Sequence, residues 1–137
     1  MKVVILTPWF SPAFKAGGPI RSLENLVLSD LKGVQFFILT SNRDVDNSIL
    51  SDVEKDQWFP FGSTSKVIYL SSFFMLGAIT RHFRSIKPDV VFISGIYSLP
   101  FSILPLLYFY SGRFIISARG MLHPQALARK SFKKNIF

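Results

Sequence analysis

The sequence predicts an α/β protein: a Rossmann-like, mainly parallel sheet with helices on both faces. Short runs rich in Val and Ile are typical of strands that are buried on both faces of a parallel sheet. Longer segments with apolar residues at helical spacing alternate with these runs, and Gly, Pro or polar residues separate the two kinds of segment. This alternation implies βαβ crossovers, and therefore parallel strands.

The first third of the chain predicts a strand–helix–strand unit. Residues 3–6 are a continuous aliphatic run, which favours a buried strand. Pro19 suits the first position of the following helix, because its missing N–H costs nothing there. Apolar residues then recur at helical spacing as far as Leu31, and Gly33 ends the helix. Residues 34–40 predict the second strand.

The rest of the chain continues this alternation. Residues 41–65 are mostly polar and predict a long loop, in which Trp58, Phe59 and Phe61 act as hydrophobic anchors. The elements expected after this loop are a strand over 66–70, a helix over 73–86, a strand over 90–93, a helix or helix pair over 99–110 and a strand over 114–117.

Length and composition fit one domain, residues 1–137, and exclude several classes of protein. The chain has 137 residues and no cysteine, which rules out disulfides, thiolate metal sites and a cysteine nucleophile. The first aliphatic run is too short for a signal peptide, and the apolar stretch 99–110 is shorter than the ~20 residues of a spanning helix. We therefore expect a cytoplasmic protein without a transmembrane segment.

The charge balance favours partners that carry phosphate. Sixteen Lys and Arg residues face eight Asp and Glu residues, which gives a net charge of +8. Such an excess suits nucleotides, anionic lipids or nucleic acid, and a solvated basic surface explains it equally well. Nucleic acid is disfavoured, because most Phe residues lie within predicted strands and helices and do not alternate with basic residues.

The glycine pair before the first helix is a candidate anion site. Gly17 and Gly18 allow close approach of a ligand to the backbone, and the N-terminus of the helix that follows attracts negative charge. Arg21 adds a fork-shaped donor in the first turn. The alternative is a plain turn between strand and helix, since neither a dinucleotide fingerprint nor a P-loop pattern is present.

Further candidates follow the ends of other predicted strands, where α/β sheets bind ligands. Asn42, Arg43 and Asp44 form a polar loop that we interpret as substrate-contacting. Asp44 and Asp46 also make a short Asp-x-Asp pattern, but chance matches are so common that we expect no metal. His123 suits a general base or a hydrogen-bond donor, and equally a turn before Pro124.

Two longer segments give these candidates a family resemblance. LTPWFSPAFKAGGPIRSLENLV, and KPDVVFISGIYSLPFSILPLL followed by FIISARGMLHPQALARKSFKKNIF, resemble family 4 glycosyltransferases of the GT-B fold. Many relatives place a histidine that binds the donor sugar where this chain has Arg119 and Gly120. We do not transfer that role to Arg119, which suits a bidentate phosphate contact or a carboxylate partner.

The resemblance implies one half of a two-domain enzyme, the acceptor-side domain, with the donor-binding domain absent. It implies transfer of a hexose from a nucleotide-diphosphate sugar to a glycan or lipid-linked acceptor, without a metal or other cofactor. The last residue, Phe137, follows an apparent helix without a stop signal, which suggests a fragment or a split gene whose donor domain is a separate chain.

The position of the tail and the function of the chain remain open at this point. The basic, amphipathic tail could rest on an anionic membrane, or pack as an ordinary surface helix; its basic residues are Arg129, Lys130, Lys133 and Lys134. The chain is then either part of an enzyme or a non-catalytic subunit that docks a donor domain at the membrane. A flavodoxin-like protein with a bound cofactor is a third possibility.

Overall fold

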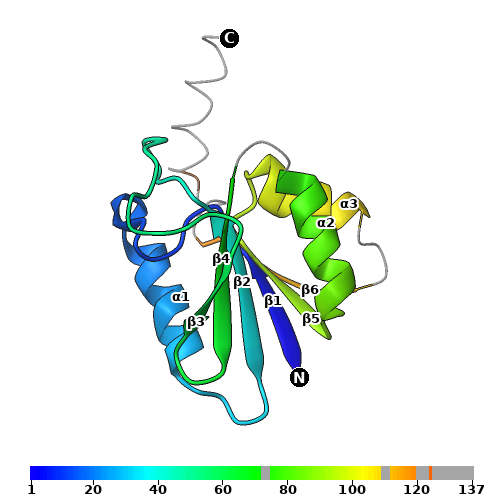
Figure 1. Cartoon of the computed structure of the whole chain (residues 1–137). Coiled ribbons are helices and arrows are strands. Elements are labelled where there is room, and N and C mark those ends of the chain that lie inside the picture. The colour runs from blue at the N-terminus through cyan, green and yellow to red at the C-terminus, as the bar shows by residue number, and fades with distance from the viewer. Residues whose placement is uncertain (72–74, 109–111, 120–123, 125–137) are drawn as a thin grey trace.

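The computed structural model describes residues 1–71, 75–108, 112–119 and 124, and it contains a six-stranded sheet (Figure 1). The strand order is β3-β4-β2-β1-β5-β6. All neighbouring strands are parallel except β3 and β4, so the predicted α/β class with a mainly parallel sheet is confirmed. The strands are β1 (Lys2–Leu6), β2 (Gln35–Ser41), β3 (Trp58–Phe61), β4 (Ser65–Leu70), β5 (Val90–Ser94) and β6 (Arg113–Ser117).

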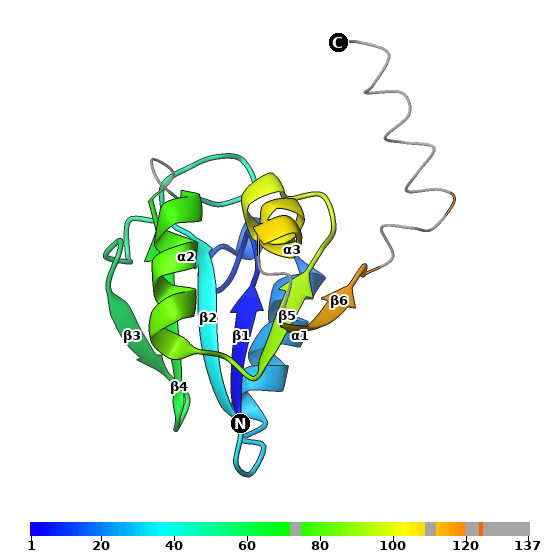
Figure 2. The ribbon, with the colours of Figure 1, turned by 90° about the vertical axis from the view of Figure 1, so that its right-hand side faces the viewer.

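Helices cover both faces of the sheet (Figure 2). On one face, α1 (Gly18–Leu28) packs over the central strands. On the other face lie α2 (Met75–Ile86) and a helix that starts as a π-helix, η3 (Leu99–Ile103), and continues as α3 (Leu104–Tyr108). Among the described residues, no helix has the length and apolar character needed to cross a membrane.

The sheet is built outwards from β1 in two directions: β2 is added on one side of β1, and β5 on the other side. From β1 the chain passes through α1 to β2 on one side, whereas α2 returns it from β4 to β5 on the other side. A crevice opens at the carboxyl ends of β1 and β5, because their following segments leave on opposite faces of the sheet. This is the place in the fold where a ligand is expected.

Successive side chains of each strand point to opposite faces of the sheet, so the interior is divided into two cores. Val3 and Ile5 face α1, while Val4 and Leu6 face α2. Val4, Ile5 and Leu6 are completely buried, as expected for a central strand of a parallel sheet that is covered twice.

Two sequence predictions were wrong. Residues 58–61 form β3, which pairs antiparallel with β4, although we expected the whole of 41–65 to be a loop. The hairpin closes at Gly62, whose φ of 68° is in the left-handed region, and Trp58 packs on one core while Phe59 and Phe61 pack on the other. α1 ends at Leu28, earlier than expected, because Asp30 takes a φ of 50°.

Substitution of Ile38 by alanine should destabilise the fold by about 2–5 kcal/mol, because this β2 side chain is fully buried between β1 and β4. The matched control is Ile49→Ala, in the loop after β2, where the side chain is 63% exposed. That change should alter the free energy of unfolding by less than about 0.5 kcal/mol. Denaturant titration measures both values; equal losses would contradict the core described here.

Candidate functional site

A pocket of about 160 Å³ lies where the strand order reverses. Its walls come from the residues after β1 and β5, from the first turn of α1 and from the end of β6. We call it the crossover pocket; it is lined by Thr7, Pro8, Trp9, Ala16, Pro19, Ile20, Leu23, Ser94, Gly95 and Arg119. The prediction that the carboxyl-end loops meet at one edge is therefore confirmed for β1, β5 and β6.

Arg119 is the only charged residue among the described residues that line this pocket. Its φ of 46° is left-handed, which is unusual for a residue with a side chain and turns the chain sharply just after β6. Its Nε is buried and makes no hydrogen bond within the described part of the chain. Burial lowers the pKa of the guanidinium, yet the group stays cationic at neutral pH. Within the described lining, this positive charge has no acidic partner.

The glycine pair stands beside the pocket, in the connection that leads into α1. Gly17 is the N-cap residue of α1 with a φ of 78°, and a Cβ built on Gly17 or Gly18 would meet no atom within 4 Å. Both residues are exposed, and the Gly18 amide makes no hydrogen bond to another described residue. The backbone at the start of α1 is therefore open to an incoming oxygen.

Three lining residues were missed by the sequence analysis. Thr7 and Ser94 are 3% and 5% exposed, and the half-buried Trp9 accepts a 3.0 Å hydrogen bond from the Thr7 hydroxyl through its carbonyl oxygen. Their position in the sequence could have indicated these residues, because Thr7 and Trp9 follow β1 and Ser94 is the last residue of β5. An aromatic ring with a few polar groups beside it is typical of pockets that bind small molecules.

The loop after β2 supplies the other predicted residues but does not line the crossover pocket. Asn42 is 9% exposed, and its Oδ1 is buried without a hydrogen bond to a described residue. Arg43 donates from Nη1 to the carbonyl oxygen of Asn47 at 2.9 Å. Arg21 is exposed on α1 and is also outside the pocket lining.

Asp44 and Asp46 tie this loop to the segment before α1. Asp44 is buried and accepts hydrogen bonds from the backbone amides of Lys15, at 3.4 Å, and Val45, at 2.7 Å. Asp46 forms an ion pair with Lys15 at 2.6 Å, and this hydrogen bond, together with those from Ser48, holds the pKa of Asp46 well below its usual range. Both carboxylates of the Asp-x-Asp pattern therefore have partners within the protein.

The remaining predicted positions lie elsewhere. Gly120 and His123 are outside the described residues, and so is the basic tail. His82, which is not one of the predicted site residues, lies on α2, against Trp58 and away from the crossover pocket. Among the described residues, no group of three His, Cys, Asp or Glu side chains is arranged to hold a metal ion.

No family model matches the chain, and neither a curated protein nor a solved structure matches it significantly. The chemistry of the site therefore rests on its geometry. A cation and an aromatic ring line one crevice. Beside this lining, the Gly18 amide at the start of α1 makes no hydrogen bond to another described residue, and the arrangement suits a polar ligand with an anionic group.

Substitution of Gly17 by alanine should destabilise the protein by about 1–3 kcal/mol, because its positive φ is a conformation that side chains rarely adopt. The matched change, Gly18→Ala, should cost less than about 0.5 kcal/mol, since Gly18 is in the first turn of α1 with open space around it. Thermal or denaturant unfolding distinguishes the two. Equal stability of both variants would refute the conformation assigned to Gly17.

A pH dependence follows from Tyr69, whose hydroxyl donates to the carbonyl oxygen of Ser11 and so ties β4 to the segment before α1. Burial, and to a lesser extent Glu24, raises the pKa of Tyr69 from 10.0 to about 12. A raised pKa contributes stability below about pH 10 that is lost as the pH rises towards 12. Unfolding free energies measured across this range should fall more steeply for the natural protein than for Tyr69→Phe; parallel curves would argue against a buried, protonated Tyr69.

Proposed function

We propose that this chain is the acceptor-side domain of a GT-B glycosyltransferase that transfers a hexose from a nucleotide-diphosphate sugar to a glycan or lipid-linked acceptor. The observation that carries the proposal is the crossover pocket, whose described lining combines Arg119, Trp9 and the first turn of α1. The family resemblance of the sequence motifs supports the same reading. The product would belong to a cell-surface polysaccharide, made in the cytoplasm or at the inner face of the membrane.

In this proposal the pocket receives the negatively charged part of the reacting substrates. Departure of a nucleoside diphosphate builds up negative charge, which a fixed guanidinium and backbone amides stabilise better than water does. Arg119 would contact the anion, and Gly17 and Gly18 would let it approach the backbone. No metal is needed for these contacts.

The half-buried Trp9 would hold a sugar ring within the same pocket. Sugar rings expose C–H groups on their flat faces, and these pack well on an aromatic side chain. Thr7 and Ser94 lie in the same lining and carry hydroxyls that match sugar hydroxyls.

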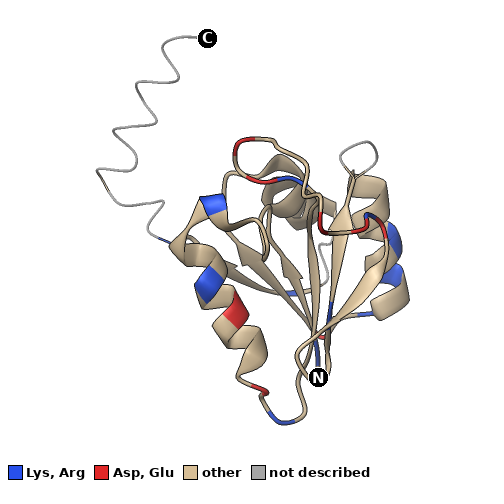
Figure 3. Cartoon of the chain, turned by 60° about the vertical axis from the view of Figure 1, so that its left-hand side comes forward, with Lys and Arg blue, Asp and Glu red and all other residues tan. Residues whose placement is uncertain are grey.

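The acidic loop at this edge favours a hydroxyl-rich acceptor over a polyanion. Five of the eight acidic residues of the chain lie in this loop: Asp44, Asp46, Asp52, Glu54 and Asp56. Figure 3 shows them at the end of the molecule opposite the amino terminus. Carboxylates bind sugar hydroxyls and repel phosphate backbones, so nucleic acid is not the expected partner. Asn42 of this loop is the predicted acceptor contact; its Oδ1 is buried and has no hydrogen-bond partner among the described residues.

The direct test is co-expression with a donor-binding domain, followed by a screen of nucleotide sugars for transfer to glycan and lipid-linked acceptors. Turnover supports the proposal. A correctly folded pair that binds acceptor without turnover with any donor favours the alternative, a non-catalytic subunit that docks a donor domain at an anionic membrane.

Binding to the single domain can be followed separately, because the chain has two tryptophans and only Trp9 lines the crossover pocket. In the Trp58→Phe variant, Trp9 is the only source of tryptophan emission. An acceptor glycan that occupies the pocket should change this emission in a saturable way. An unchanged signal for glycans that the active pair uses as acceptors would contradict the assignment of this pocket.

Substitution of Arg119 by glutamine should lower the turnover of the assembled enzyme by about 10²–10³-fold, the usual effect of removing one preorganised donor to a developing anion. The matched control is Arg113→Gln at the opposite end of β6, where the residue is exposed and outside the pocket lining. Initial rates with a saturating acceptor measure the effect. Equal rates for both variants would show that Arg119 does not contact the reacting groups.

A further inference from the structure

A second pocket, of about 240 Å³, lies at the opposite edge of the sheet, between α2 and the amino-terminal ends of the strands. We call it the amino-edge pocket. Its lining includes Lys2, Phe37, Trp58, Lys66, His82 and Ser85. These residues are distant in the sequence, and the sheet register brings three of them to one face, since Lys66 pairs with Phe37 and Phe37 with Val4, two residues after Lys2.

We propose that this pocket binds a small ligand through a phosphate group. Its described lining carries two ammonium groups, one imidazole and one hydroxyl, but no carboxylate. Phosphate is the common biological anion that uses several such donors at once. The proposal concerns a different edge of the molecule from the crossover pocket and does not depend on glycosyl transfer.

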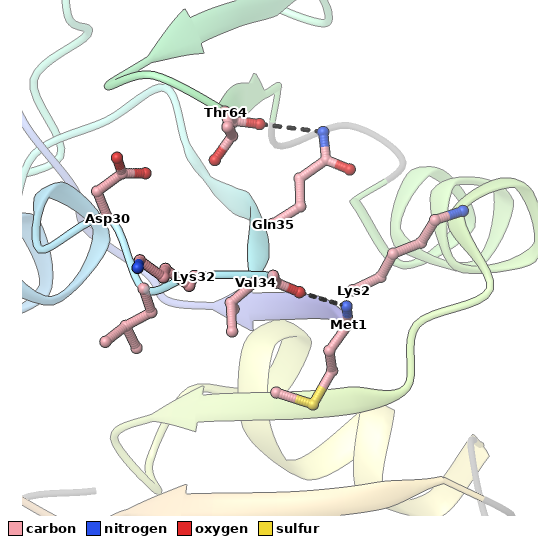
Figure 4. A pocket seen from close by; sticks show the side chains of 9 residues that line it. Met1, Lys2, Asp30, Lys32, Val34, Gln35 and Thr64 are labelled. Atoms are coloured by element: carbon pink, nitrogen blue, oxygen red, sulfur yellow. Dashed lines mark hydrogen bonds between the residues drawn. The ribbon is translucent and has the colours of Figure 1, made fainter.

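The two lysines differ in whether their side chains already have a hydrogen-bond partner. Figure 4 shows a wider hollow beside the amino terminus, of about 560 Å³, and the Lys2 side chain leaves it in the direction of α2. There Lys2 Nζ donates to the carbonyl oxygen of Ile86 at 3.3 Å, which satisfies one acceptor at the end of the helix. Lys66 makes no ion pair or hydrogen bond with its side chain among the described residues, so its charge is available to a ligand.

His82 provides an unused hydrogen-bonding group. Its Nε2 is buried and makes no hydrogen bond to a described residue, and its ring packs edge-on against Trp58 with centroids 5.3 Å apart. Phe37 holds Trp58 from the other side, at a centroid distance of 5.8 Å. Aromatic rings therefore fix the imidazole at the wall of the pocket.

The charge around His82 would change when phosphate binds. Burial and then Arg81 on the same helix lower the pKa of His82, and Asp56 opposes them weakly. Lys2 and Lys66, from β1 and β4, line the same pocket. A phosphate group placed among these cations would favour the imidazolium form and raise the pKa of His82.

Trp58 gives a specific readout, because the Trp9→Phe variant leaves it as the only tryptophan. This variant is titrated with inorganic phosphate at constant ionic strength, with chloride as the replaced anion. We expect a saturable change in Trp58 emission and, by NMR, a rise in the pKa of His82. Emission that changes equally with chloride, or a histidine that titrates identically with and without phosphate, would overturn the proposal.

Lys66→Gln in the same background should weaken phosphate binding about tenfold or more, because a charge-assisted hydrogen bond is lost. The matched control is Lys32→Gln, an exposed lysine that lines only the wider hollow. Both positions are exposed, so both variants should keep the circular dichroism spectrum of the parent. Equal weakening by the two substitutions would mean that phosphate responds only to net charge, and the assigned pocket would be rejected.

Discussion

Hydrogen bonding of β1 to two parallel neighbours is the constraint on which the rest of the structure depends. β1 pairs with β2 along one edge and with β5 along the other, and Val4, Ile5 and Leu6 are completely buried as a result. Because all three strands run in the same direction, their carboxyl ends meet at one edge of the sheet. The reversal of strand order at β1 then leaves the crossover pocket between the segments that diverge from this edge.

A pocket at a strand end is useful only if the loops around it hold their shape. Here the segment between β1 and α1 is held by three contacts from two elements. Tyr69 of β4 donates to Ser11, and in the loop after β2 Asp44 accepts from the Lys15 amide while Asp46 pairs with the Lys15 side chain. These contacts come from residues that the sequence presents as a polar loop and as a buried strand. They position the segment that leads to Gly17, the N-cap of α1, and to Gly18, its first residue, and a Cβ at either glycine would meet no atom within 4 Å.

The sheet was predictable from the sequence because its strands are continuous aliphatic runs, and the same patterns placed the polar residues at the carboxyl edge. β3 could not be predicted from the sequence. It has only four residues and contains Pro60, so its residue pattern does not distinguish a short edge strand from a loop. The hydrogen bond by which Asp44 holds the segment before α1 could not be predicted either, because its partner Lys15 lies 29 residues away in the sequence. Likewise, Lys2, Lys66 and His82 meet only after α2 packs on the sheet.

The distribution of charge connects the two ends of the sheet. A net charge of +8 would attract any polyanion if it were spread evenly, but five of the eight acidic residues lie in the loop over the carboxyl edge. That edge therefore combines a half-buried cation, Arg119, which lines the crossover pocket, with a loop whose carboxylates lie outside the pocket lining. The amino edge has the opposite character, with Lys2, Lys66 and His82 around a pocket whose described lining lacks acids. β1 begins with Lys2 in the amino-edge pocket and is followed directly by Thr7 in the crossover pocket, so one central strand connects the two pockets.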